Sequence, residues 1–244
     1  MSSSSERDAA PVSVVMPAYN EAEILETTLA DVVQGLRDRD VAFELIVCEN
    51  GSTDGTLALA RELADKYDEV RVEHLAAADY GLALRAGLLA AHGHAVVNFD
   101  ADYYDLDFLE AAVARVADPN GPAIVVGTKR GAGANDTRSP MRKLVTATFS
   151  TLLRVVFALR VSDTHGMKAL RRETIEPYAR RCRFGQDLFD TELILRVERA
   201  GLRTAEIPVD VVERRPARSS ILRRIPRTLL GLVKLRVALW RDRW

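Results

Sequence analysis

The chain has 244 residues, of which 48% are hydrophobic and 28% are charged. This composition is that of an ordinary globular domain and excludes a disordered or fibrous protein. The sequence has no uncharged apolar run of about 18 residues, and its polar start differs from a signal peptide. We therefore expect a cytoplasmic protein with a disordered leader (residues 1–10), one α/β domain (residues 11–217) and a basic C-terminal segment (residues 218–244).

Strands and helices alternate through the first half of the sequence. Short apolar runs predict strands at Val12–Met16, Phe43–Cys48, Val70–His74, Ala95–Phe99 and Ile124–Gly127. Apolar residues at helical spacing predict helices at Glu21–Arg37, Leu57–Tyr67, Leu82–His92 and Leu106–Val116. Such alternation requires crossover connections, so it predicts a doubly wound, mostly parallel sheet with helices on both faces.

The alternation ends after Gly127. One apolar face predicts a long helix over Met141–Leu159, followed by a helix at Leu188–Ala200 and a strand at Ala205–Val212. Gly201 suits the position just after a helix end.

The C-terminal segment is strongly basic. From Arg218 to Trp244 the sequence holds seven Arg, one Lys and one Asp, which suggests an anionic partner. A helix beginning at Pro226 would align an apolar stripe made of Leu230, Val233, Val237 and Trp240. This helix is either an interfacial membrane anchor or a helix docked on its own core. Nucleic acid is not expected as a partner, because no aromatic platform or recognition motif accompanies the basic residues.

Asp100 and Asp102 are the sharpest functional signal. Both follow a predicted strand directly, and residues two apart in an extended chain point the same way. Converging carboxylates are costly unless a cation joins them. Mg²⁺ or Mn²⁺ suits such a pair, because it takes one or two carboxylates and completes its coordination with phosphate and water.

Polar residues also follow the three earlier strands. The carboxyl ends of parallel strands share one edge, where ligands bind, and the loops fit a nucleotide diphosphate. The residues expected to line this crevice are Pro17, Tyr19, Glu21, Glu49, Asn50, Gly81 and Asp100. Ser52-Thr53-Asp54 is interpreted as a turn and helix cap.

These segments resemble family 2 glycosyltransferases with the GT-A fold. The residues that carry the resemblance are Pro17–Glu21, Gly51–Thr56, Gly81–Gly87 and Asp100–Asp102. Asp163–Lys168, Phe189–Val209 and Arg215–Ser220 are similar to the dolichyl- or polyprenyl-phosphate mannose synthase branch. The likeness covers about residues 12–222, although Glu49-Asn50 stands where the family usually has two Asp.

The resemblance implies transfer of mannose or glucose from a GDP or UDP sugar, with Asp102 as the main metal ligand and Asp100 beside it. It also implies that basic residues bind the phosphate of a polyprenyl phosphate acceptor at a membrane surface. The candidates are Lys129, Arg130, Arg142, Lys168, Arg215 and Arg218. His165 is interpreted as a hydrogen-bonded loop residue.

Two other functions are compatible with the sequence. A sugar or small-molecule hydroxyl acceptor would need a general base, and Asp187 would serve; Asp187 is alternatively an N-cap or first-turn acid of the following helix. In the second alternative, the chain is a catalytically silent module that binds a nucleotide sugar or a membrane.

Overall fold

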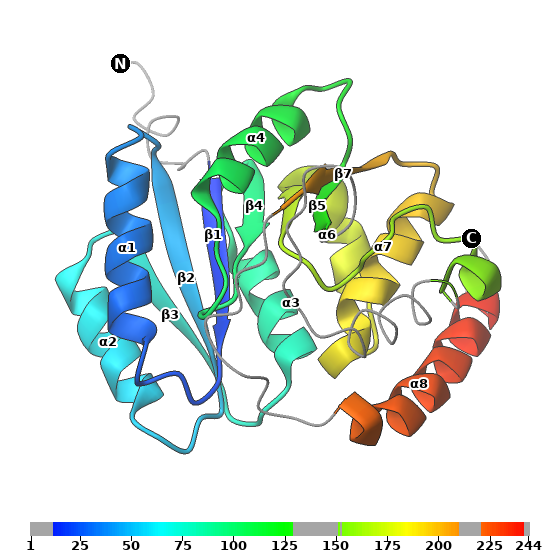
Figure 1. Ribbon diagram of the computed structural model, residues 1–244, viewed down its shortest axis with the longest axis horizontal. Coiled ribbons are helices and arrows are strands. Elements are labelled where there is room, and N and C mark those ends of the chain that lie inside the picture. The colour runs from blue at the N-terminus through cyan, green and yellow to red at the C-terminus, as the bar shows by residue number, and fades with distance from the viewer. Residues whose placement is uncertain (1–11, 129–150, 152, 210–220, 242–244) are drawn as a thin grey trace, which may run out of the picture.

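The computed structural model describes residues 12–128, 151, 153–209 and 221–241 (Figure 1). The strands are β1 (Val12–Ala18), β2 (Phe43–Asn50), β3 (Val70–Leu75), β4 (Ala95–Asn98), β5 (Ile124–Thr128), β6 (Lys168–Arg171) and β7 (Thr204–Pro208). The helices are α1 (Leu25–Arg37), α2 (Thr56–Lys66), α3 (Tyr80–Ala90), α4 (Leu106–Ala117), α6 (Arg172–Arg181), η1 (Gln186–Leu188, a 3₁₀ turn), α7 (Phe189–Arg199) and α8 (Ile221–Arg241).

The seven strands form one open sheet in the order β3-β2-β1-β4-β6-β5-β7. The pairs β1–β2, β1–β4, β2–β3 and β5–β7 are parallel. β6 lies between β4 and β5 and runs antiparallel to both. The predicted α/β fold with a mostly parallel sheet is therefore confirmed, with one reversed strand inside it.

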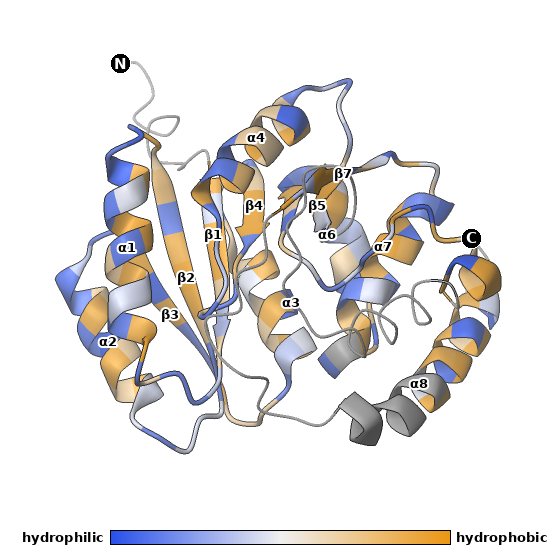
Figure 2. Cartoon of the chain, viewed as in Figure 1, coloured by the Kyte–Doolittle hydropathy of each residue, from blue (hydrophilic) through white to orange (hydrophobic). Residues whose placement is uncertain are grey.

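Helices cover both faces of the sheet. Residues of α1, α2 and α4 pack on one face, with Val14 and Met16 of β1, while residues of α3, α6, α7 and α8 pack on the other, with Val15. The central strands are mostly apolar because helices cover both sides of the sheet (Figure 2), and the polar pair Ser13 and Glu44 inside them is hydrogen-bonded. This burial leaves the strand ends as the place for polar chemistry.

The predicted elements of the first half are confirmed, with boundaries shifted by a few residues. The helix expected from Glu21 begins at Leu25, and β1 continues through Pro17 to Ala18. Gly201 follows the end of α7 with a positive φ of 80°, the left-handed backbone that glycine adopts readily. β6 and α6 were not predicted. The helix expected over Met141–Leu159 lies mostly outside the described residues, which show helix at residues 153–157.

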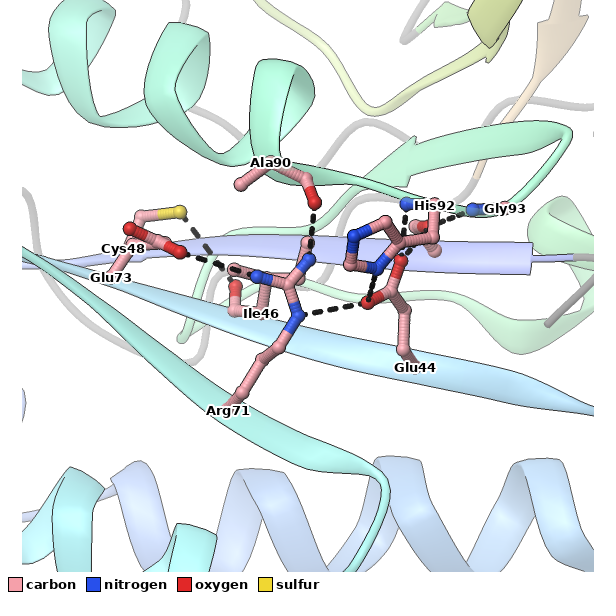
Figure 3. A network of polar contacts seen from close by, with 9 residues as sticks. Glu44, Ile46, Cys48, Arg71, Glu73, Ala90, His92 and Gly93 are labelled. Atoms are coloured by element: carbon pink, nitrogen blue, oxygen red, sulfur yellow. Dashed lines mark hydrogen bonds and ion pairs between the residues drawn. The ribbon is translucent and has the colours of Figure 1, made fainter. Parts of the chain in front are cut away.

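A polar network ties the amino end of β2 to β3 and to the turn before β4 (Figure 3). Arg71 Nε donates to Glu44 Oε2 at 2.8 Å, and the backbone N–H of His92 donates to Oε1 at 2.6 Å. The Ser13 hydroxyl donates to the same Oε1 at 2.5 Å. Burial alone would raise the pKa of Glu44, but these donors hold it below its ordinary value.

Replacing Glu44 with Gln should destabilise the protein by about 2 kcal/mol at neutral pH, because charge-assisted hydrogen bonds are lost. Since the pKa is lower in the folded state, the carboxylate stabilises the fold above the ordinary value of 4.5 and loses this effect as the pH falls through the folded pKa. The stability difference between Glu44→Gln and the parent should therefore shrink below that value. Urea unfolding across this range measures it, with the exposed Glu62→Gln as control; a pH-independent difference would contradict the charge argument.

Candidate active site

The two predicted metal carboxylates lie on a tight turn at the carboxyl end of β4. The backbone N–H of Asp100 donates to the Tyr103 carbonyl, and the N–H of Tyr103 donates to the Asp100 carbonyl, both at 3.1 Å. Thr28 of α1 anchors the middle of the turn by donating its hydroxyl to the Ala101 carbonyl at 2.8 Å. Asp102 is exposed and Asp100 is half-buried. The turn therefore presents one carboxylate to solvent and places the second partly inside the protein.

Tyr80, the first residue of α3, holds the inner carboxylate. Its phenolic hydroxyl donates to Asp100 Oδ1 at 2.9 Å. Burial and then the charge of Asp102 raise the pKa of Asp100, while the Tyr80 hydrogen bond and the positive charge of Lys168 oppose the rise. Burial and the charge of Asp100 raise the pKa of Tyr80 well above its ordinary value, which keeps the phenol protonated as a donor. No role was predicted for Tyr80 from the sequence.

Lys168 forms a buried ion pair below this turn. Its ammonium lies 3.1 Å from Asp190 Oδ1 of α7 and donates to the Gly166 carbonyl at 2.8 Å. The side chains of Lys168 and Asp190 are only 1% and 3% exposed. This placement conflicts with the prediction that Lys168 binds the acceptor phosphate, because both of its contacts point into the protein. Asp190 was not predicted, since its role depends on a strand that the sequence pattern did not reveal.

The segment that precedes Lys168 is a hydrogen-bonded turn. Asp163 accepts from the backbone N–H of His165 at 2.9 Å, and the Thr164 hydroxyl lies 3.1 Å from His165 Nδ1. Thr164 also contacts the Thr191 hydroxyl of α7 at 2.9 Å. These contacts agree with the interpretation of His165 as a hydrogen-bonded loop residue.

The loops that follow β1 and β2 interlock at the same edge of the sheet. The backbone N–H of Asn20 donates to the Ser52 hydroxyl at 3.0 Å, and the N–H of Thr53 donates to Asn20 Oδ1 at 2.8 Å. Asp54 Oδ1 accepts from the first backbone N–H of α2 at 2.9 Å, although the N-cap residue of this helix is Gly55. Tyr19 stays 42% exposed on this braced loop, and its contact with a base stays a prediction.

Two other predicted crevice residues of the first loop have backbone positions fixed by the fold. Pro17 lies inside β1, beyond the last residue paired with β4, so its missing N–H removes no bond to that strand. The backbone N–H of Glu21 donates to the Thr56 hydroxyl at 2.9 Å. The first loop is therefore tied to the start of α2.

Glu49 and Asn50, at the end of β2, are buried supports of the crevice. Glu49 Oε1 accepts from the Ser52 N–H at 2.6 Å, and Oε2 lies 2.5 Å from His74 Nδ1. Asn50 Oδ1 accepts from the backbone N–H of Asp79 at 2.6 Å. Burial would raise the pKa of Glu49, but these donors lower it. The predicted contacts of Glu49 and Asn50 with the nucleotide remain predictions, and in the structure both side chains fix the surrounding loops.

Gly81 allows a close approach between α3 and the turn before α7. A Cβ at Gly81 would lie 2.7 Å from backbone atoms of Gln186, so only glycine fits. Asp79 Oδ1 holds the two segments together, since it accepts from the N–H groups of Leu82 at 2.9 Å and Gln186 at 2.6 Å. The backbone of Asp187 in η1 is thereby held against the start of α3, next to Tyr80.

The N-cap interpretation of Asp187 is wrong as stated. The residue at the N-cap of α7 is Leu188, and the acids of the first helical turn are Asp190 and Glu192. The general-base interpretation of Asp187 stays a prediction. The other basic residues predicted to bind the acceptor, Lys129, Arg130, Arg142, Arg215 and Arg218, lie outside the described residues.

The donor set of the Asp100–Asp102 turn fits Mg²⁺ or Mn²⁺. Among the described residues, no three His, Cys, Asp or Glu side chains are arranged to hold a metal by themselves. A pair of carboxylates at a solvent-exposed turn instead matches an ion that takes most of its ligands from phosphate and water. Asp100 and Asp102 are the residues that would hold such an ion.

An open α/β sheet with an Asp-x-Asp turn at its carboxyl edge defines the GT-A class of glycosyltransferases. The model of the glycosyl transferase family 2 matches residues 13–178, so the chain belongs to this family. The mannosyltransferase PcManGT from Pyrobaculum calidifontis, solved with GDP-Man and Mn²⁺, superposes with a TM-score of 0.65 at 27% identity. That comparison covers 96% of this chain and 65% of the other.

Two curated relatives come from Haloferax volcanii. Glycosyltransferase AglD is 35% identical over 204 residues, covering 82% of this chain and 32% of AglD. A dolichyl-phosphate hexose transferase is 30% identical over 205 residues and covers 83% of each chain. This chain thus spans about a third of the length of AglD.

Breaking the Lys168–Asp190 pair should destabilise the protein strongly. Lys168→Met leaves Asp190 as an unpaired buried charge, at a cost of about 3–5 kcal/mol, and the double variant Lys168→Met/Asp190→Leu should recover much of it. Urea unfolding of the single and double variants measures this coupling. If Lys168→Met keeps the stability of the parent but raises the KM for a phosphate acceptor, then Lys168 binds the acceptor as the sequence predicted.

Proposed function

We propose that the protein is a metal-dependent, inverting glycosyltransferase that transfers mannose or glucose from a GDP or UDP sugar to polyprenyl phosphate. The observation that carries the proposal is the Asp100-Ala101-Asp102 turn, braced at the carboxyl edge of the sheet beside the interlocked loops after β1 and β2. The name of the relative that matches over 83% of both chains supports a lipid phosphate as acceptor.

The donor is proposed to lie across the carboxyl ends of β1, β2 and β4. Tyr19 frames the base from its exposed position, and Glu21 contacts the ribose hydroxyls. Asp102 and Asp100 are the residues that would hold the metal, and Tyr80 orients Asp100 through its hydrogen bond. Bound there, Mg²⁺ or Mn²⁺ would neutralise the charge that develops on the departing diphosphate.

The proposed acceptor needs little activation. A phosphate monoester is anionic near neutral pH, so its oxygen can attack the anomeric carbon without a general base. The new bond joins that oxygen to the anomeric carbon, and the bond to the nucleotide β-phosphate breaks, releasing the nucleoside diphosphate. A single displacement inverts the anomeric centre. Arg142 and the other predicted basic residues would position the phosphate.

Asp102→Asn should lower kcat by about a hundredfold or more, because the metal loses its exposed carboxylate ligand. The variant should also bind Mn²⁺ more weakly in the presence of GDP or UDP, measured by titration calorimetry. Asp65→Asn on the exposed surface of α2 is the matched control. Normal turnover and normal Mn²⁺ binding by Asp102→Asn would refute the metal site.

The acceptor is tested by the release of GDP or UDP from each nucleotide sugar with Mn²⁺, with and without polyprenyl phosphate. Release that depends on the lipid phosphate supports the proposal. Release that depends on a sugar or small-molecule hydroxyl supports the second candidate function. If the protein binds the nucleotide sugar but releases no GDP or UDP under any condition, the result supports a catalytically silent binding module.

The second candidate, a hydroxyl acceptor, is favoured by one observation: Asp79 holds η1, and with it the backbone of Asp187, against the start of α3, whose first residue Tyr80 donates to Asp100. Asp187→Asn separates the two candidates. A general base contributes about 10²–10⁴-fold to turnover, so a loss of this size indicates a hydroxyl acceptor, whereas a loss below about tenfold indicates that the acceptor is already ionised. Circular dichroism confirms that the variant is folded.

A further inference from the structure

The helix α8 has two apolar faces, and only one of them is used by the fold. Leu232, Leu235 and Leu239 are 4%, 0% and 2% exposed and belong to the core that also contains α3, α6 and α7. Gly231 lies against Leu188 of η1, where a Cβ would collide with the leucine side chain. The docked-helix interpretation of the C-terminal segment is therefore correct for this face.

The predicted apolar stripe lies on the other face. Its four residues are exposed: Leu230 by 59%, Val233 by 62%, Val237 by 42% and Trp240 by 79%. At 3.6 residues per turn they fall on one side of the helix, opposite the docked leucines. A row of large exposed apolar side chains is unfavourable in water and marks an interaction surface.

The charges beside this stripe are all positive. Lys234 and Arg241 border it on one side and Arg236 on the other, and all three are exposed. The sequence of α8 contains no Asp or Glu. Partial burial and then the positive charge of Arg236 lower the pKa of Arg199 on α7.

A second exposed apolar segment belongs to the same part of the molecule. The helical stretch at residues 153–157 buries Leu153 and Phe157 in the core cluster that holds the inner face of α8. On its outside, Val155 and Val156 are 79% and 38% exposed, and Arg154 is exposed as well. Exposed apolar side chains beside a cation thus occur on this stretch as well.

We propose that the outer face of α8, made of Leu230, Val233, Val237, Trp240 and the flanking Lys234, Arg236 and Arg241, docks on an anionic lipid surface. The occupant is a bilayer rather than a protein because every charge around the apolar stripe has the same sign, which matches anionic headgroups over acyl chains. In the described part of the chain, no helix is long and apolar enough to cross a membrane, so this contact is interfacial.

This surface is coupled to the candidate active site through η1. The inner face of α8 contacts Leu188, which directly follows Asp187, and η1 is in turn held by Asp79 at the start of α3. A helix lying on a bilayer would therefore keep the crevice close to the membrane surface. The inference rests on the exposed face of α8 and does not require the proposed reaction.

The test uses the full-length protein without any sugar nucleotide, mixed with vesicles of phosphatidylcholine alone or with phosphatidylglycerol. We expect sedimentation with the anionic vesicles only, weakened by salt. In the variant Trp244→Phe, Trp240 is the remaining tryptophan, and its emission should shift to the blue on binding.

Two double variants locate the contact. Lys234→Glu/Arg236→Glu should lower partitioning into anionic vesicles by about tenfold or more, and Val233→Ser/Val237→Ser by about tenfold. The matched control is Arg61→Glu/Arg115→Glu, which changes the net charge equally on α2 and α4, at the opposite face of the sheet.

Equal weakening by the control would overturn the proposal, because binding would then follow net charge alone. Absence of binding to anionic vesicles would also overturn it. Light scattering decides the remaining possibility: a dimer that Val233→Ser/Val237→Ser dissociates would make this face a contact between two copies of the chain. Since no donor is present, these outcomes are independent of whether the proposed transfer reaction occurs.

Discussion

Asp100 and Asp102 carry like charges on one short turn, and the surrounding elements compensate for their repulsion. Tyr80 donates a hydrogen bond to the inner carboxylate, and Lys168 supplies a buried positive charge nearby. Lys168 is itself balanced by Asp190 of α7. Elements from distant parts of the chain, α3, β6 and α7, thus converge near the turn and lower the cost of placing the half-buried Asp100 beside the exposed Asp102.

The loops around this turn are held by polar side chains that accept hydrogen bonds from the protein's own backbone. Glu49, Asn50 and Asp79 each accept hydrogen bonds from N–H groups of adjoining loops. The loops at this edge of the sheet lie beyond the hydrogen bonds that join the strands. Side-chain acceptors bind their backbone N–H groups instead and fix their conformation. Residues that were predicted to contact a ligand therefore hold the loops in place, while the side chains of Tyr19 and Asp102 are exposed to solvent.

The C-terminal helix has one apolar face in the core and a second apolar face exposed to solvent. Its leucines complete the core on the side of α3, α6 and α7, and its remaining apolar residues stay outside between cations. The two interpretations of the sequence, a docked helix and an interfacial anchor, are thus compatible, since they concern different faces of the same helix. Through Leu188 the docked face also adjoins the segment that carries Asp187.

The sequence by itself determined the alternating strands and helices, the mostly parallel sheet and the paired carboxylates at the end of β4. These features are local: an apolar run, a helical period and two Asp at one strand end are visible in a few consecutive residues. The tertiary structure decided the rest. β6 is four residues long and takes its place only by pairing with β4 and β5, and that pairing buries Lys168, which the sequence had assigned to the acceptor. Which face of α8 is buried was likewise settled only by packing, because both faces are apolar and a helical pattern cannot tell which of them meets the core.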